Sequence, residues 1–204
     1  LVRVKTNLPG QFSVYNALAA ISCARLLGVS LADAAAALET AHGAKGRVEP
    51  VPTDGDYSIF IDYAVTPDAI ENVLTTLRGI APKRLVMLFG AGGDRDRKKR
   101  PIMGKLSADI ADFVIVTSDN PRTEDPMSII EEILPGVRAG KAPYKVICDR
   151  PEAIRWAIDH HEPGDVILLC GKGHEDYQII GHEKIHMDER EIVADYLAER
   201  AKRT

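Results

Sequence analysis

Beyond residue 56, hydrophobic residues occur in short continuous runs, and the segments between them carry apolar positions at helical spacing. A continuous apolar run is typical of a strand buried on both faces, and in parallel sheets such strands alternate with helices. The pattern therefore predicts an α/β fold in which helices flank a parallel sheet. The predicted strands are YSIFIDY (57–63), RLVMLFG (84–90), DFVIVTS (112–118), YKVICD (144–149) and DVILLCG (165–171).

Helices are expected between these strands, and a different pattern follows the last of them. The stretch DYQIIGHEKIHM (176–187) predicts a short hairpin that turns at Gly181. A final helix is predicted from about residue 189. The helices predicted between strands cover 67–79, 101–111, 126–134 and 151–161.

The beginning of the chain follows another pattern. Residues 11–42 are rich in alanine and have helical periodicity, and Gly28 and Ser30 mark a break, so two helices in a small unit are predicted. The Gly- and Pro-rich segment 43–56 predicts a linker, with a boundary near Gly46. Residues 1–10, LVRVKTNLPG, alternate like a strand and lack an initiator Met, which indicates a fragment of a longer polypeptide.

Composition narrows the function classes. A chain of 204 residues with 45% hydrophobic content predicts a globular protein, and a net charge of −4 argues against a nucleic-acid binder. No apolar run approaches the roughly 18 residues of a membrane span, and no signal-peptide pattern is present, so membrane insertion is not expected. The cysteines are too few and scattered for a disulfide framework, which favours the cytoplasm. They are Cys23, Cys148 and Cys170.

Unusual polar residues follow the predicted strands. Ligands of open parallel sheets bind beyond the carboxyl ends of the strands, so these segments are the candidates for a site. The glycine run GAGGDR (90–95) lacks the third glycine of a dinucleotide fingerprint, which disfavours a dehydrogenase, and no phosphate loop of the G-x-x-x-x-G-K-[ST] type occurs. Taken in isolation, the charged run 94–100 is typical of a solvated surface, but its position at a strand end argues against that interpretation.

The segment DNPR (119–122) has the chemistry to recognise an amino acid. Pro121 stiffens the backbone around its neighbours. Arg122 offers a fork that grips a carboxylate, and Asp119 is able to accept from an ammonium group. An ordinary turn that caps the helix near Pro126 explains the same residues about as well.

The segment GKGHEDY (171–177) offers a second candidate wall. Gly171 and Gly173 allow close approach of a ligand, and Glu175 adds a carboxylate near Asp119 if the two strands are neighbours. The alternative is a Gly-rich turn that enters the hairpin. His174 has no second ligand at a metal-binding spacing, so no metal site is assigned.

Taken together and in this order, GGDRDRKKRP, DNPRTEDP and GKGHE resemble the Mur ligases, ATP-dependent amide ligases of peptidoglycan precursor synthesis. The resemblance covers essentially the whole chain. It implies that residues 1–46 are the end of the central ATP-binding domain, and that 47–204 are the C-terminal Rossmann-like domain. The segment GRVE (46–49) would be the interdomain linker and hinge.

The resemblance also implies site residues. By this likeness the segment itself contains no catalytic residue and no metal ligand. Asn16 would contact adenine, Asp62 the ribose, and Arg47 would approach the nucleotide. The residues that match a pocket for meso-diaminopimelate are Arg95, Asp119, Asn120, Arg122, Gly171 and Glu175.

The implied reaction is amide formation in peptidoglycan synthesis. ATP, with Mg²⁺, would phosphorylate the free carboxylate of UDP-MurNAc-L-Ala-D-Glu, and the amine of meso-diaminopimelate would attack the acyl phosphate. The resemblance places the phosphate loop and the UDP-sugar domain outside this segment, so the segment alone is expected to be inactive. A stand-alone amino-acid-binding module and a lysine-adding ligase remain the alternatives. Two residues depart from the family pattern: Val65 replaces a histidine, and Ser13 an asparagine.

Overall fold

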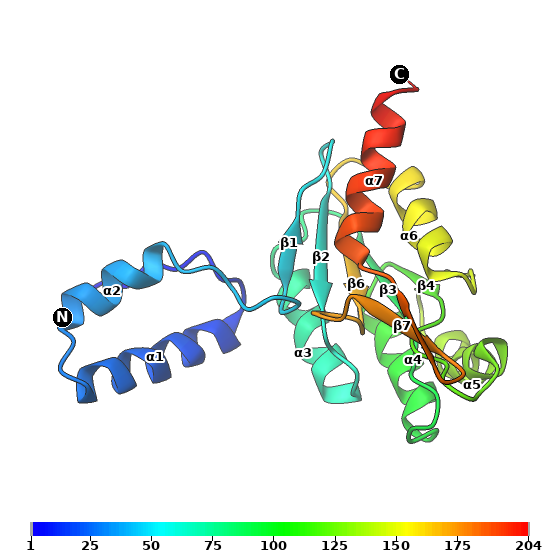
Figure 1. Cartoon of the computed structure of the whole chain (residues 1–204), viewed down its shortest axis with the longest axis horizontal. Coiled ribbons are helices and arrows are strands. Elements are labelled where there is room, and N and C mark those ends of the chain that lie inside the picture. The colour runs from blue at the N-terminus through cyan, green and yellow to red at the C-terminus, as the bar shows by residue number, and fades with distance from the viewer. Residues whose placement is uncertain (1, 204) are drawn as a thin grey trace. The chain divides into compact units, whose positions relative to one another are not determined.

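The computed structural model describes residues 2–203, which form two compact units divided between Ala44 and Lys45 (Figure 1). The first unit contains two helices, α1 (Gln11–Leu26) and α2 (Leu31–Glu39). Gly28 separates them with a φ of 88°, and the Ser30 hydroxyl accepts a hydrogen bond from the Asp33 N–H, so the predicted break is confirmed.

The strand expected at the beginning of the chain is wrong for the part that the structure describes. Residues 2–9 contain no helix or strand. Alternation along a few residues produces a strand only where another strand pairs with it, because the backbone groups of a single extended segment have no partners.

The second unit is built on a six-stranded sheet in the order β1-β2-β6-β3-β4-β5. All neighbours from β2 to β5 in this order are parallel, which confirms the predicted α/β fold and its parallel sheet. The parallel strands are β2 (Ser58–Asp62), β3 (Leu85–Phe89), β4 (Phe113–Val116), β5 (Tyr144–Val146) and β6 (Val166–Cys170).

A further strand, β1 (Glu49–Val51), lies inside the segment that was expected to be only a linker. It pairs antiparallel with β2, and Pro50 stands opposite Phe60. A proline is tolerated there because β1 is at the edge of the sheet and one side of its backbone needs no partner. Three residues with little apolar character give no local signal for such a strand.

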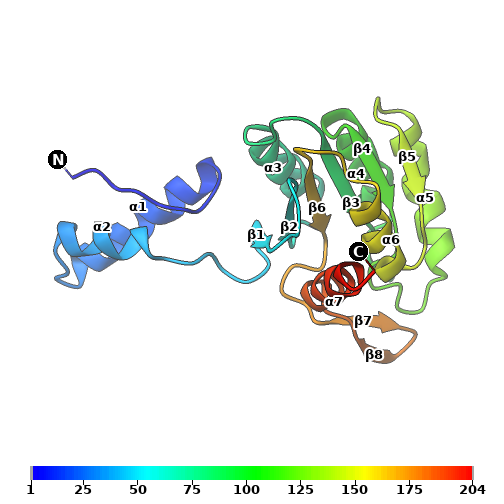
Figure 2. The ribbon, with the colours of Figure 1, turned by 90° about the horizontal axis from the view of Figure 1, so that it is seen from above.

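Five helices cover the two faces of the sheet. Leu85, Met87 and Phe89 of β3 pack in one apolar cluster with α3, α4 and α5, whereas Val86 and Leu88 pack in a second cluster with α6 and α7. Figure 2 shows α3 and α4 on the opposite side of the sheet from α6 and α7. The helices are α3 (Pro67–Arg78), α4 (Lys99–Ile110), α5 (Pro126–Arg138), α6 (Arg150–Asp159) and α7 (Glu189–Ala201).

The start of α5 separates two interpretations of the segment around DNPR. The Asp125 side chain caps the helix by accepting from the Ser128 N–H at 2.7 Å, and Pro126 stands in the first turn. The helix therefore uses a later residue for its cap and leaves Asp119 and Arg122 for other contacts. Pro135 does not end the helix, which continues to Arg138, four residues beyond the predicted end.

The predicted hairpin is confirmed as β7 (Tyr177–Ile180) and β8 (Glu183–His186), with Gly181 in its turn at a φ of 61°. Its first strand is fastened to the loop after β4. The Arg122 N–H donates to the Ile179 carbonyl at 3.0 Å, and the Gly181 N–H donates to the Arg122 carbonyl at 2.6 Å. Among the described residues, no helix combines the length and the apolar character needed to cross a membrane.

Candidate functional site

The loops after β4 and β6 meet, although β3 lies between these two strands. Glycines at the end of β3 allow the loop after β3 to lie close against the loop after β4. A Cβ on Gly90 would lie 2.4 Å from the Thr117 carbonyl oxygen, and one on Gly93 would lie 1.8 Å from the Pro121 carbonyl oxygen. The Gly93 N–H donates to the Asn120 carbonyl at 2.9 Å. Side chains at these positions would push the loop after β3 away from the loop after β4, so the glycine run here serves close backbone packing of these two loops.

A buried polar network joins the two loops. The Asn120 side-chain amide donates to Glu175 Oε2 at 2.9 Å, and its oxygen accepts from Lys172 Nζ at 2.8 Å. Lys172 Nζ also donates to the same Glu175 oxygen at 2.7 Å. The Ile179 N–H of the hairpin donates to the Asn120 amide oxygen at 2.9 Å. Three segments that are far apart in sequence are therefore held together by one amide.

The electrostatics of Glu175 follow from these contacts. Burial favours the neutral form of the carboxyl, but the hydrogen bonds from Lys172 and Asn120 outweigh burial and hold the pKa of Glu175 below its usual range. Glu175 is therefore an ionised carboxylate at neutral pH, and one of its oxygens is already occupied by protein donors.

Asp119 differs from Glu175 in having a spare oxygen. Its Oδ1 accepts from the Asn120 N–H at 2.6 Å, whereas Oδ2 is buried and has no hydrogen-bond partner among the described residues. A Cβ on Gly171, whose φ is 115°, would lie 2.6 Å from Oδ2. The absence of a side chain at Gly171 therefore keeps space open next to a carboxylate oxygen that can accept from an amine.

Two arginines flank Gly92. A Cβ on this glycine would lie 2.9 Å from Arg122 Nη1 and 3.7 Å from Arg95 Cγ. Arg122 has a left-handed backbone, with a φ of 52°, and its Nη1 donates to the Gly93 carbonyl at 2.7 Å. Arg95 is exposed and donates to the Asp94 carbonyl at 3.1 Å. An anionic group near Gly92 would lie beside the Arg122 guanidinium and next to the aliphatic part of the exposed Arg95 side chain.

Arg150 is a buried side chain that contacts the ends of both strands leading into the candidate site. Its guanidinium donates to the Ser118 carbonyl at 3.2 Å and to the Cys170 carbonyl at 2.8 Å, at the ends of the strands that carry the two loops. Glu189 of α7 neutralises it at 2.9 Å, and both side chains are fully buried. Arg150 thus fixes the spacing between the β4 and β6 ends.

A second group of candidate residues lies at the end of β2. The Asp62 carboxylate accepts from the Val48 N–H at 2.9 Å and from the Ala64 N–H at 2.8 Å, and burial raises its pKa. Arg47 is exposed, and its guanidinium lies over the Tyr63 ring at 5.3 Å. The structure thus brings Arg47 and Asp62 to one place, where Asp62 also holds the backbone in position.

Asn16 stands apart from the other candidates. It lies on α1 in the first unit, where its side chain is exposed, whereas all other candidate residues belong to the second unit. Within the second unit, the structure gathers Arg95, Asp119, Asn120, Arg122, Gly171 and Glu175 around the ends of β3, β4 and β6.

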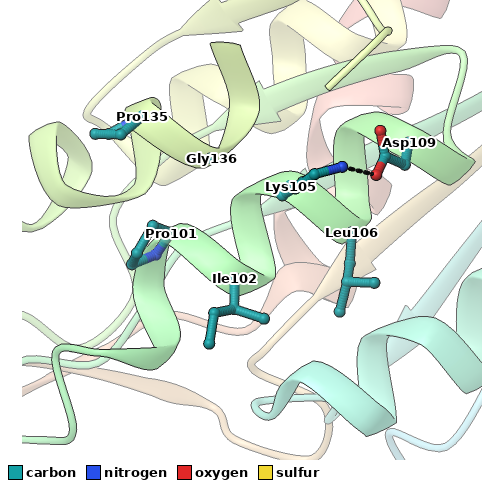
Figure 3. Close-up of a pocket in the computed structure, with 7 residues that line it drawn as sticks. All are labelled: Pro101, Ile102, Lys105, Leu106, Asp109, Pro135 and Gly136. Carbon is teal, nitrogen blue, oxygen red and sulfur yellow. Dashed lines mark hydrogen bonds and ion pairs between the residues drawn. The ribbon is translucent and has the colours of Figure 1, made fainter. Parts of the chain in front are cut away.

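Two hollows of the surface lie outside this group of residues. One of about 510 Å³ is lined by residues of α4 and α5, and the Lys105–Asp109 pair stands in its wall (Figure 3). Another of about 510 Å³ lies between β1 and α7. Within residues 2–203, no group of three or more His, Cys, Asp or Glu side chains is arranged to hold a metal ion.

A profile described as "Mur ligase, glutamate ligase domain" matches residues 46–173. The chain belongs to the Mur ligase family. It is 52% identical over 199 residues to the UDP-N-acetylmuramoyl-L-alanyl-D-glutamate--2,6-diaminopimelate ligase of Caldanaerobacter subterraneus, over 98% of this chain and 41% of that protein. Identity to the ligase of the same name from Syntrophomonas wolfei is 46%, over 98% of this chain and 41% of that protein.

A solved structure of a ligase with the same name superposes on this chain with a TM-score of 0.75 at 38% identity. The match covers 97% of this chain and 40% of that one. The chain therefore spans about two-fifths of the length of the Mur ligases it matches. The family expected from the three sequence motifs is confirmed.

Two residues that contact this candidate site were not predicted from the sequence. Lys172 is the second residue of the motif GKGHE, but the motif gives no indication that its side chain is completely buried. Arg150 follows Asp149, which caps α6, and a charged residue in a first helical turn is ordinarily solvated. A signal existed for Arg150 in its position directly after the predicted strand 144–149, but its partner Glu189 is too distant in sequence to suggest the pair.

Proposed function

We propose that this chain is the amino-acid-binding, C-terminal portion of an ATP-dependent ligase. The complete enzyme would join meso-diaminopimelate to UDP-MurNAc-L-Ala-D-Glu through an acyl phosphate, in the peptidoglycan synthesis of the cytoplasm. In this proposal residues 1–46 end the central ATP-binding domain, and 47–204 are the domain that delivers the amine. The names of the relatives and the chemistry of the site support it together.

The observation that carries the proposal is the unpaired Oδ2 of Asp119, buried beside the strand end that also presents Arg122. A buried carboxylate oxygen without a donor is costly, and an ammonium group of a ligand would supply the missing hydrogen bond. The arginines near Gly92 would pair with an anionic group of the same ligand. An amino acid has both charges, and diaminopimelate has a second carboxylate that lysine lacks.

Different residues would bind different groups of this ligand. Arg122 and Arg95 would hold the distal carboxylate, Asp119 would accept from an ammonium group, and Gly171 leaves room for it. Glu175 and Asn120 would contact the ligand through polar atoms that are not used in the hydrogen bond between them. Positioning the amine for attack is itself a large contribution to such a reaction, worth several kcal/mol of barrier, so none of these residues has to act as a nucleophile.

The nucleotide side of the proposal is carried by Arg47, Asp62 and Asn16. The exposed Arg47 guanidinium is available to a phosphate or an adenine ring, and each Asp62 oxygen retains a lone pair for a ribose hydroxyl. ATP would supply the phosphoryl group, with Mg²⁺ held mainly by the remainder of the enzyme. Val65 provides no imidazole hydrogen bond at the position where the family pattern has histidine.

The test compares diaminopimelate with lysine in the full-length protein that contains this chain. We expect ligation of diaminopimelate and a rejection of lysine that approaches a factor of about 10⁴, because lysine would leave the arginines without their anionic partner. Arg122→Ala should raise the KM for diaminopimelate by roughly 100-fold or more and leave the KM for ATP nearly unchanged.

The exposed Arg155→Ala on α6 is the matched control and should behave as the unsubstituted enzyme. Ligation of lysine in preference to diaminopimelate would assign the chain to a lysine-adding ligase. Binding of diaminopimelate by a full-length protein that forms no amide would identify a binding module. Either result would overturn the proposal.

A further inference from the structure

Lys172 is a charged side chain with no access to solvent. Burying an ammonium group is expensive unless other groups replace its water. Here Nζ donates to Asn120 Oδ1 at 2.8 Å and to Glu175 Oε2 at 2.7 Å, and it lies 5.2 Å from the centre of the Tyr177 ring. All these partners belong to the loops and the hairpin that form the candidate amino-acid site.

The first consequence concerns the Asn120 amide. Its oxygen accepts from both Lys172 Nζ and the Ile179 N–H, and its nitrogen donates to Glu175. Turning the amide over would place its NH₂ group against an ammonium group and an N–H donor, and its oxygen against a carboxylate. Lys172 is therefore one of three groups, with the Ile179 N–H and Glu175, that fix which face of Asn120 is turned to the site.

The second consequence concerns the charge of Glu175. The titratable groups that face this carboxyl are Lys172 from its own loop and Tyr177 from β7, and Arg122 and Tyr63 lie around Tyr177. Lys172 is the cation in direct contact. Without it, only the hydrogen bonds from Asn120 and Tyr177 would oppose burial, and the carboxyl would take up a proton at a higher pH.

We propose that Lys172 is a positioning residue of the amino-acid pocket, one that orients Asn120 and keeps Glu175 ionised without touching the ligand itself. Its complete burial excludes direct contact, because a ligand in the site reaches only accessible atoms. The inference rests on the proposed function, since it assigns Lys172 a part in binding diaminopimelate.

The test is Lys172→Met in the full-length enzyme, since methionine retains most of the volume and removes the charge. We expect the KM for diaminopimelate to rise roughly 10- to 100-fold at neutral pH, because small displacements of contact groups have effects of this order. The KM for ATP should change little. As the pH is lowered from neutral, the KM for diaminopimelate of the variant should rise further, whereas that of the unsubstituted enzyme should remain nearly constant over the same interval.

Two more variants separate positioning from folding. In Lys172→Met/Glu175→Gln the uncompensated charge is gone, so this protein should fold even if the single variant does not. Its KM for diaminopimelate should exceed that of Glu175→Gln, because the Asn120 amide has lost the Lys172 donor and is held less firmly. It should also lack the extra pH dependence. Lys105→Met, which removes an exposed lysine from its pair with Asp109, is the control for loss of a charge.

The outcomes distinguish this inference from the proposed function. An unsubstituted enzyme that does not ligate diaminopimelate overturns the proposed function and this inference with it. If the unsubstituted enzyme ligates diaminopimelate, this inference alone is overturned by an unchanged KM in Lys172→Met. It is also overturned if the KM for diaminopimelate depends on pH in the same way in Lys172→Met and in Lys172→Met/Glu175→Gln. Equal KM values for the double variant and Glu175→Gln would overturn it as well.

Discussion

The two compact units of this chain differ in how they are specified. Among residues 2–44, three side chains are buried, and they are the small residues Ser13, Ala34 and Ala35. The unit that starts at Lys45 has a continuous apolar cluster on each face of its sheet. The helices of the first unit therefore depend on local signals, such as alanine content and a serine cap, whereas the second unit depends on contacts between distant segments.

Leucines show the contrast most directly. Leu26 at the end of α1 is 88% exposed, while Leu74 of α3 is completely buried in the cluster under the sheet. The same residue type thus contributes to burial in one unit and remains at the surface in the other. Substitutions at matched residue types are the means to test whether this difference holds in solution.

The largest effect is expected for Leu74→Ala. Removing a buried leucine side chain typically costs about 2–5 kcal/mol of the free energy of unfolding, through lost burial and the cavity left behind. The only tryptophan, Trp156, lies on α6 in the same unit, so its fluorescence during urea unfolding reports the change.

The matched substitution is Leu26→Ala, followed by hydrogen exchange of the α1 amides. It should change the stability of the helix by no more than about 0.5 kcal/mol, because the side chain is at the surface and alanine favours helices. A loss at Leu26 equal to that at Leu74 would show that the first unit packs its leucines in solution and would remove the contrast.

An intermediate effect is expected in acid, and it belongs to the second unit. The hydrogen bond from Arg100, which is fully buried, lowers the pKa of Glu124 to about 2. A carboxyl whose pKa is depressed in the folded state stabilises the protein above its unfolded pKa, near 4.5, and this contribution disappears as the pH falls toward 2. Since Glu124 is partly exposed, the contribution is on the order of 1 kcal/mol after allowance for solvent screening.

The measurement is urea unfolding of the unsubstituted chain and of Glu124→Gln at several pH values, followed by Trp156 fluorescence. The difference in unfolding free energy should be about 1 kcal/mol near neutral pH and should close between pH 4.5 and about 2. The exposed Glu71→Gln on α3 serves as the comparison and should show a much smaller difference. A difference for Glu124→Gln that is independent of pH would contradict the assignment of this ion pair.

The contrast between the units also explains what the sequence predicted. All five parallel strands and the helices between them were visible because their apolar runs and spacing are local properties. The edge strand β1 was missed, and a strand in residues 1–10 was wrongly expected, because strand formation there depends on whether a partner is present. The helix predicted for 126–134 ends too early, because α5 continues through Pro135 while Gly136 packs closely against the Pro101 carbonyl.

The candidate site, too, was predictable from the sequence only in part. The motifs around Asn120 and Glu175 were recognisable, and a meeting of the two loops was expected only if their strands were neighbours. The strands are not neighbours, but the loops still meet, through the close approach of Gly171 to Asp119 and the hydrogen bonds of Asn120 with Lys172 and Glu175. Residue types at strand ends are thus readable from sequence, whereas burial, such as that of Lys172, is decided by segments far apart in the chain.

The smallest effect is expected at the helix caps. Each unit has a helix with a side-chain cap, so the loss of one capping hydrogen bond can be compared between the two units. Ser30 accepts from the Asp33 N–H at 3.0 Å in front of α2, and Thr66 accepts from the Ala69 N–H at 3.3 Å in front of α3. Replacing either residue by alanine removes one capping hydrogen bond, which usually costs about 1 kcal/mol.

The consequence should nevertheless differ, because only α3 has a buried apolar stripe to hold the rest of the helix. Ser30→Ala should accelerate hydrogen exchange about fivefold along all of α2, while Thr66→Ala should accelerate it only in the first turn of α3. Ser30→Asp, which retains an acceptor at the cap, should restore the slower exchange in α2. If Thr66→Ala loosens α3 along its whole length, then local signals govern the second unit as well, and the distinction between the two units fails at the level of single helices.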